Sequence, residues 1–259
     1  MIYLTGDTHT DFGRFTNKMR SRLPFVLTEK DHVIVTGDLG LLWVDNKSFR
    51  YNLDWMSRLP FKLLWVQGNH ENYDMIKEYP VEFWHGGKVR HILRDKIILL
   101  ERGQIFSIED QTFFTFGGAS THDAPGGILD RNSSDFEEKK KRAVRKKQRY
   151  RVVGETWWPE ELPVEAELLE GRENLKKVDY RVDYVISHCG SNRVQRIFMD
   201  FYAEKYRKEK YYDKNLLTDF FDELEEKLEY KRWFMGHYHH DLEIDDKHRI
   251  LDEKIIPLY

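Results

Sequence analysis

Short polar clusters of aspartate, asparagine and histidine recur along the 259-residue chain, and these side chains are common metal ligands. One cluster, GHYHH, places His237, His239 and His240 within four residues. The other clusters read GDTH from Gly6, GDLG from Gly37, GNHE from Gly68 and SHCG from Ser187. Their oxygens and imidazole nitrogens suit first-row divalent and trivalent ions. The candidate ligands are therefore Asp7, His9, Asp38, Asn69, His188, His237 and His239, with His70 beside them.

A predicted β-strand ends just before each cluster. The strands are short runs of β-branched, aromatic and leucine residues, and their continuous apolar character indicates burial on both faces. Sites in open α/β sheets assemble at the carboxyl ends of the strands, so we expect the clusters to converge. A glycine precedes most of them and permits the tight turn that directs a side chain into the site. The predicted strands begin at Ile2, His32, Lys62, Lys96, Gln111, Asp183 and Lys231.

The segments between strands include amphipathic helices. Apolar side chains recur on one face of residues 47–59 and of residues 215–230. Strands alternate with helices early in the chain and follow one another closely in its middle. This order predicts an α/β fold in which two packed sheets form a sandwich flanked by helices. We expect a single domain over residues 1–259, with a charged helical insertion around 133–178.

The predicted insertion begins with a highly charged helix over residues 133–151. Two tryptophans and a proline follow, and a second helix is expected from Pro163. We expect Trp157 and Trp158 to anchor the insertion by packing. The basic residues from 139 to 151 form either a solvated helix face or a positive groove for phosphorylated or nucleic-acid substrates.

Composition argues against several classes of protein. The net charge of −3 and an isoelectric point near 6.4 argue against a generally basic nucleic-acid binder. The single cysteine, Cys189, excludes an intramolecular disulfide and a zinc site of the CxxC type, and we expect it to be buried. No segment has the ~18 consecutive apolar residues of a membrane helix, and no signal peptide opens the chain. We therefore expect a cytoplasmic protein with no membrane partner.

The ordered set GDxH, GD, GNHE, H and GHxH resembles the calcineurin-like metallophosphoesterase superfamily, over nearly the whole chain. The stretches GGASTHD, WWPEELP and GHYHHD are similar to a bacterial and phage-type subgroup of it. The resemblance implies a four-layer αββα sandwich with a dinuclear metal centre. The expected cofactors are two divalent or trivalent ions per chain, drawn from Mn, Fe, Zn and Ni.

The resemblance also implies a role for each candidate residue. The implied ligands are Asp7, His9 and His239 for one metal, Asn69, His188 and His237 for the other, and Asp38 as the bridge. A hydroxide held between two metals ~3.5 to 4 Å apart would attack phosphorus in line. His70 is left over as a non-ligand beside the phosphate, where it would donate a proton to the leaving oxygen.

The implied function is hydrolysis of a phosphate monoester or diester. A phosphomonoesterase that acts on a phosphoprotein, as Ser/Thr phosphatases do, or on a small molecule is the preferred form. The alternative is a phosphodiesterase or nuclease that acts on nucleotides or nucleic acid. A third hypothesis is a scaffold that binds phosphate without turnover.

The sequence departs from the family pattern after Asp38. Many members continue this cluster as GDxxDR, whereas Leu41 and Leu42 stand at the Asp and Arg positions here. The group that orients His70 is therefore left open, and Glu71 and Asp45 are both candidates. Without a carboxylate partner, His70 is a weaker base and is more readily neutral near pH 7.

Further residues near the clusters have two interpretations. On an extended strand, His237 and His239 point the same way and His240 points elsewhere, although a loop would relax that rule. The role of His240 stays open. His122 and Asp123 follow a glycine-rich stretch, where they either belong to a turn or line the substrate mouth.

Overall fold

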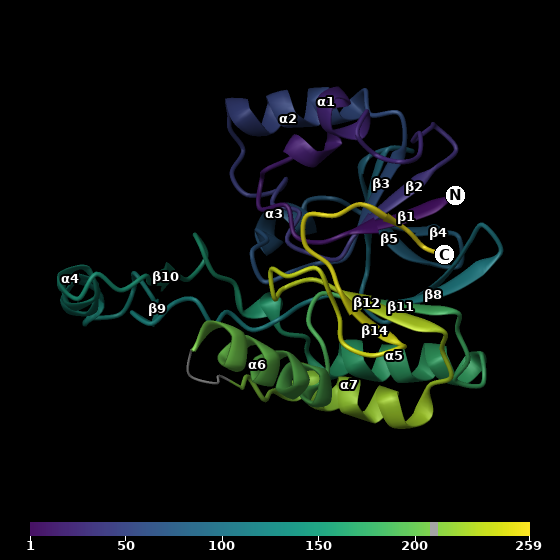
Figure 1. The fold of residues 1–259 in the computed structure, drawn as a ribbon. Helices are drawn as coiled ribbons and strands as arrows, with labels where there is room; N and C mark the ends of the chain where they lie inside the picture. Colours follow the sequence, from purple (N-terminus) through teal and green to yellow (C-terminus); the bar gives the residue numbers. More distant parts are fainter. Residues whose placement is uncertain (208–211) are drawn as a thin grey trace.

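The computed structural model describes residues 1–207 and 212–259, and its main body contains two β-sheets packed face to face (Figure 1). Seven strands form the first sheet and six form the second. In spatial order, the first sheet contains β15 (Ile256–Pro257), β1 (Ile2–Thr5), β2 (His32–Val35), β3 (Lys62–Trp65), β6 (Ile97–Leu100), β5 (Gly87–Leu93) and β4 (Val81–Trp84). The second contains β13 (Leu242–Glu243), β14 (His248–Ile250), β12 (Arg232–Met235), β11 (Tyr184–Ser187), β8 (Gln111–Phe116) and β7 (Gln104–Ile108).

Helices cover the outer face of each sheet and complete a four-layer arrangement (Figure 1). The helices over the first sheet are α1 (Asn17–Arg20), α2 (Lys47–Ser57) and α3 (Tyr73–Lys77). Those over the second sheet are α5 (Glu165–Lys177), α6 (Asn192–Tyr206) and α7 (Leu216–Lys227). The predicted α/β sandwich with flanking helices is confirmed. Among the described residues, no helix combines the length and the apolar character needed to cross a membrane.

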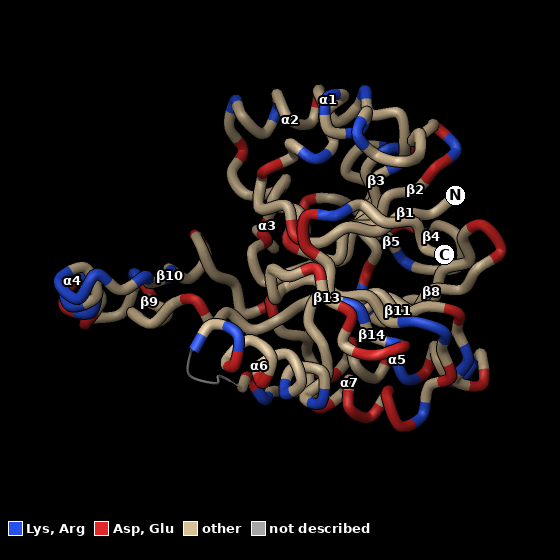
Figure 2. Tube along the Cα trace, viewed as in Figure 1, with Lys and Arg blue, Asp and Glu red and all other residues tan. Residues whose placement is uncertain are grey.

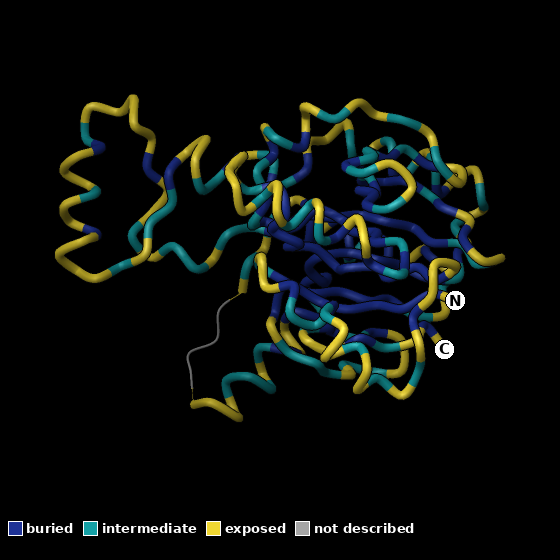
Figure 3. The backbone as a smooth tube through the Cα atoms, turned by 90° about the horizontal axis from the view of Figure 1, so that it is seen from above, coloured by how far each residue is buried: buried dark blue, intermediate teal, exposed yellow. Residues whose placement is uncertain are grey.

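Buried residues are concentrated along the strands of the two sheets (Figure 3), and most of their side chains are apolar. Between the sheets, Leu4 and Ile34 belong to the same buried cluster as Ile186 and Phe234. A second cluster lies between the first sheet and α2, and a third lies between the second sheet and helices α5 to α7. Both faces of the central strands are therefore covered, which explains their uninterrupted apolar sequences.

The central strands of each sheet run parallel. In the first sheet these are β1, β2, β3 and β6, and in the second they are β8, β11, β12 and β14. The polar clusters follow β1, β2, β3, β11 and β12. Strand direction therefore delivers polar side chains from both sheets to the carboxyl ends of their strands.

Several elements differ from the sequence-based expectations. The apolar run that begins at Lys96 forms two strands, β6 in the first sheet and β7 in the second, with Gly103 (φ +70°) between them. The hairpin of β4 and β5 was not predicted, although its turn contains Gly86 (φ +97°), which is a turn signal. Helix α6 was also missed, and Ser191 caps it through a side-chain bond to the amide of Val194.

A narrow arm, defined here as residues 126–153, projects from the main body (Figures 1 and 3). It contains β9 (Ile128–Leu129), α4 (Phe136–Arg145) and β10 (Arg151–Val152), and β9 pairs in parallel with β10. Leu129, Phe136 and Val152 form a small core of its own. The arm therefore has packing of its own to fix the position of β10.

The region predicted as an insertion, 133–178, occupies two places in the structure. Helix α4 lies in the arm, whereas α5 packs against the second sheet through Leu168 and Leu175. The connection between them is anchored by Trp158, which is buried in the cluster beneath α2 and donates from Nε1 to Asp74 at 2.7 Å. The second helix begins at Glu165, two residues after Pro163.

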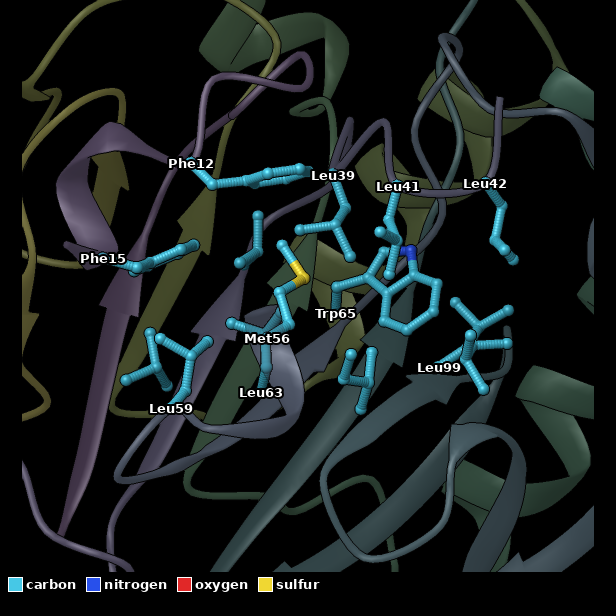
Figure 4. Packing of buried hydrophobic residues seen from close by; sticks show 14 of the residues in the cluster. Phe12, Phe15, Leu39, Leu41, Leu42, Met56, Leu59, Leu63, Trp65 and Leu99 are labelled. Carbon is cyan, nitrogen blue, oxygen red and sulfur yellow. The ribbon is translucent and has the colours of Figure 1, made fainter. Parts of the chain in front are cut away.

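The two leucines that replace the family's Asp and Arg lie in the hydrophobic core. Leu41 and Leu42 are 3% and 0% exposed, and they pack with Trp65 and Leu99 (Figure 4). The chain after Asp38 therefore turns its side chains into the layer beneath α2. Neither position is available to the active site.

We expect Leu41→Asp to destabilise the fold rather than to restore the family motif. A carboxylate at this position would be buried without a partner, which costs about 3 kcal/mol or more. Leu41→Met conserves volume and should cost less than ~1.5 kcal/mol. Denaturant unfolding of both variants measures the difference, and equal stability of the two would contradict this assignment.

Candidate active site

The predicted metal ligands converge at the carboxyl ends of the strands. In one group the ligand atoms of Asp7, His9 and His239 lie within 4.8 Å of one another. In another, those of Asp7, Asp38 and His188 do so. In the first group, Asp7 and His9 follow β1 of the first sheet, and His239 lies in the loop after β12 of the second. The second group also joins both sheets, because Asp38 follows β2 and His188 follows β11. The structure thus brings together side chains separated by more than half of the chain.

Asp38 lies between histidines from both sheets. Its Oδ2 atom is 3.6 Å from Nε2 of His9 and 3.5 Å from Nε2 of His188, and its Oδ1 accepts from the amide of His70 at 2.7 Å. Burial opposes its ionisation, but His188, His70 and His9 hold the pKa of Asp38 well below its usual range. The charged form of the carboxylate, which is the form that binds cations, is therefore favoured.

The glycines of the clusters leave room for the ligands themselves. A Cβ on Gly68 would lie 1.9 Å from Oδ1 of Asp38, and one on Gly236 would lie 2.1 Å from Oδ1 of Asp7. Such distances exclude any side chain at these positions. Close approach of the backbone, in addition to the predicted turn, explains these glycines.

His188 is oriented by the main chain. Its Nδ1 lies 2.7 Å from the carbonyl oxygen of Thr36, which fixes Nε2 toward Asn69 Oδ1 at 3.1 Å. When Nδ1 donates to the carbonyl, a neutral ring has only a lone pair at Nε2 to offer to this oxygen. A proton or a metal cation must therefore lie between them. In addition, Nε2 of His9 is buried without a hydrogen-bond partner, so the donor set fits metal ions.

His237 and His239 lie on a loop rather than on an extended strand. Strand β12 ends at Met235, and both histidines have positive φ angles, +67° and +50°. The amide of His237 donates to Oδ1 of Asp7 at 3.0 Å, and the ring of His239 stacks on that of His9 at 4.9 Å. Burial and His188 lower the pKa of His237, which favours the neutral form that binds metals.

His240 points away from this group. Its Nε2 is 3.2 Å from the hydroxyl of Tyr206, and its ring contacts those of Phe198 and Tyr202. The question left open by the sequence is thereby answered, because the third histidine of GHYHH belongs to an aromatic cluster beside α6.

Three residues that support the ligands were not predicted. Asn69 Nδ2 lies 3.4 Å from the hydroxyl of Thr121, which donates to Glu161 at 2.6 Å. This contact directs the amide oxygen of Asn69 toward His188. Arg14 donates to the carbonyl oxygen of Asp7 at 2.6 Å and so holds the end of β1. No spacing signal links these residues to the clusters. The partners of Thr121 and Glu161 are distant in the chain, and Arg14 belongs to a short 3-10 turn shortly after the first cluster.

His70 lies beside the ligand groups without belonging to either of them. Its ring centroid is 5.2 Å from that of His9. The two carboxylates considered as its partner are engaged elsewhere, because Glu71 accepts from the amide of Leu39 at 3.0 Å and Asp45 pairs with Arg50. Burial lowers the pKa of His70, and although the charge of Asp38 opposes this shift, the charge of Arg151 adds to it. The neutral form predicted from the sequence is thereby favoured.

Two adjoining cavities open at this group. An inner cavity of ≈ 230 Å³ is lined by Asp38, Asn69, His70, His122, Asp123, Arg149, His237 and His239. An outer cavity of ≈ 460 Å³ is lined by His9, Thr10, Gly40, Trp43, His70, Asp123, Arg149, Arg151 and His239. His122 lines the inner cavity and Asp123 lines both, and the ring of His122 lies 4.9 Å from that of His237.

Comparison with known proteins identifies the family of the chain. The family model for calcineurin-like phosphoesterases matches residues 1–241. The chain belongs to the calcineurin-like phosphoesterase family. Among solved structures, the phosphopantetheinyl hydrolase of Mycobacterium tuberculosis is similar over 97% of this chain and 87% of that chain, with 16% identity and a TM-score of 0.43. A comparison with curated proteins finds no match.

Family membership confirms the resemblance found in the sequence. This phosphoesterase is a metal-dependent hydrolase of phosphate esters. Its candidate ligands are the oxygen and nitrogen donors that first-row ions favour. The ions would be held where Asp7, Asp38 and their histidine neighbours meet.

We expect metal affinity to rise with pH through the neutral range. Burial opposes protonation of His188, but Asp38 and Asp7 raise its pKa to about 9, so a metal must displace a proton below that pH. One displaced proton changes the dissociation constant about tenfold per pH unit. Calorimetric titration with Mn²⁺ at several pH values, in buffers of different ionisation enthalpy, measures the dissociation constant and the number of protons displaced by the metal. Affinity that is constant with pH would contradict the expectation, and His240→Gln is the control that should keep the slope.

We expect Thr121→Val to weaken metal binding without unfolding the protein. The substitution removes the hydroxyl that lies between Asn69 and Glu161, and loss of such an outer contact commonly costs about 10- to 100-fold in affinity. Thr121→Ser keeps the hydroxyl and should bind nearly as the parent protein does. Equal metal affinity of the two variants, measured by the same titration, would show that the contact does not orient Asn69.

Proposed function

We propose that this phosphoesterase acts on phosphate monoesters through a dinuclear metal centre, with His70 as the proton donor. The observation that carries the proposal is the convergence of carboxylate, amide and imidazole ligands around Asp38, with the buried core behind them and a cavity in front. Small phosphate esters or phosphoproteins are the proposed substrates. Cytoplasmic location and the choice among Mn, Fe, Zn and Ni stay predictions.

The ligand roles are those that the resemblance to the family implies. Asp7, His9 and His239 would hold one ion, and Asn69, His188 and His237 the other, with Asp38 shared between them. Bound ions lower the pKa of water and neutralise phosphate oxygens. The chain itself supplies the fixed positions of these groups, because main-chain donors hold both aspartates and a main-chain acceptor holds His188.

His70 is positioned to act on the leaving oxygen. It lines both cavities, and its amide is held by Asp38 while its ring faces His9. If the reacting phosphate occupies the inner cavity, the bond that breaks lies near the boundary between the two cavities. The ring of His70 is then adjacent to this bond. The negative charge of a bound phosphate would raise the pKa of His70 and favour its protonated form, and a proton given to the leaving oxygen lowers the barrier most for poor leaving groups.

We expect His70→Asn to affect substrates in proportion to the basicity of their leaving group. The kcat/KM for phenyl phosphate should fall about 10²- to 10⁴-fold, because phenolate is a poor leaving group unless it receives a proton. p-Nitrophenyl phosphate should lose much less, because p-nitrophenolate leaves unprotonated. Asp38→Asn should abolish both activities, and steady-state assays with Mn²⁺-loaded protein measure these ratios. An equal loss on the two substrates for His70→Asn would contradict the role of proton donor.

A phosphodiesterase is the second candidate function. The outer cavity of ≈ 460 Å³ has room for a second ester group, which favours this alternative. We expect p-nitrophenyl phosphate to be hydrolysed faster than bis(p-nitrophenyl) phosphate. The reverse order in the same assay would support the diesterase, including the nuclease form. Two metals per chain without turnover of either ester would support a scaffold that only binds phosphate.

A further inference from the structure

The two cavities divide a bound substrate into two parts. Three predicted ligands, Asp38, Asn69 and His237, line only the inner cavity, whereas His239 lines both cavities and His9 lines only the outer one. Trp43 and Arg151 line only the outer cavity. The reacting phosphate therefore belongs in the inner cavity, and the leaving group extends into the outer one. A volume of ≈ 460 Å³ lies within the range of sites for small organic ligands.

An arginine pair from the arm gives the outer cavity a positive wall. Arg151 donates from Nη2 to both carboxylate oxygens of Asp123, at 2.9 and 2.7 Å. Nη1 of Arg149 lies 3.5 Å from the same carboxylate, and its side chain is 80% exposed. Two guanidinium groups share one carboxylate, so the wall carries a net positive charge. An anionic group in this cavity would meet complementary charge.

The fold fixes Arg151 more firmly than a surface arginine. Its side chain is 19% exposed, it belongs to β10, and it lies in register with Ile128 of β9. The adjacent residue, Val152, packs with Leu129 and Phe136 in the small core of the arm. The guanidinium is thus preorganised, which reduces the entropy lost when it binds an anion.

No other described arginine or lysine lines either cavity. Figure 2 shows basic residues concentrated along the arm, and of these only Arg149 and Arg151 belong to the cavity linings. The position after Asp38 at which many relatives carry arginine holds Leu42, which is buried in the core. The arm is therefore the source of positive side chains for the substrate.

We propose that Arg151 binds an anionic group on the leaving-group side of the substrate. The preferred substrates are then phosphate esters whose leaving group carries a second phosphate. Asp123 acts as a positioning residue that holds the guanidinium, and Arg149 adds charge at the mouth. This inference rests on the proposed function, because it assumes that the reacting phosphate lies beside Asp38.

Adenosine 5′-monophosphate and adenosine 3′,5′-bisphosphate form a matched pair of probes that differ by one phosphate. We expect Mn²⁺-loaded protein to bind the bisphosphate about tenfold or more tightly than the monophosphate, as judged by calorimetric titration. A charge-assisted hydrogen bond accounts for a difference of this size. Arg151→Gln should remove the preference and leave monophosphate affinity within about threefold.

Asp123→Asn separates anion binding from a purely structural ion pair. Both Arg151→Gln and Asp123→Asn break the charge pair, so a structural role predicts the same loss for both variants. The proposal predicts that Asp123→Asn keeps or strengthens the preference, because a negative charge is removed while the amide oxygen of the new side chain can still accept from the guanidinium. Lys141→Gln removes one charge from the exposed face of α4 and should change nothing.

The outcomes are distinct. The proposal would be overturned if the parent protein bound the two nucleotides with equal affinity. It would also be overturned if Arg151→Gln and Asp123→Asn reduced the preference for the bisphosphate equally. An equal loss with Lys141→Gln would also overturn it, because it would indicate diffuse attraction of a polyanion to the whole arm. If the protein binds the bisphosphate preferentially but hydrolyses no p-nitrophenyl phosphate, the proposed function fails while the anion site stands.

Discussion

The carboxylate of Asp38 is a buried charge on which both sheets depend. It follows β2 of the first sheet, yet its nearest imidazole partners include His188, which follows β11 of the second. A buried carboxylate is costly unless charged or hydrogen-bonding groups surround it. Here His188, His9 and the amide of His70 provide those groups. The two sheets must therefore pack with the carboxyl ends of their strands at the same edge, which also places the candidate metal ligands together.

Close backbone approach is the second constraint on this site. Asp38, His9, His237 and His239 all have positive φ angles, which residues other than glycine adopt rarely. Such conformations persist only where the surroundings determine them, as they do here through main-chain bonds to Asp7 and Asp38. Binding metals would offset the strain and the charge repulsion that convergence creates.

The divergence after Asp38 places two leucines in the core at positions where the family pattern has polar residues. Leu41 and Leu42 were recognised as departures from the family pattern, and they lie in the core with Trp65 (Figure 4). Asp123 and Arg151 line the outer cavity together with His70, although 28 residues separate them in the chain. No periodicity or motif connects these two residues, because the arm that carries Arg151 is placed by its own small core.

The sequence by itself determined the fold class and the candidate ligands, because buried parallel strands have continuous apolar runs and their polar ends stand out against them. Only tertiary structure decided what supports these ligands and what faces the substrate. Thr121, Glu161 and Arg14 act through hydrogen bonds that folding creates, and such contacts leave no local pattern. The orientation of His240 was also decided by its neighbours, since an aromatic cluster beside α6 holds its ring away from the site.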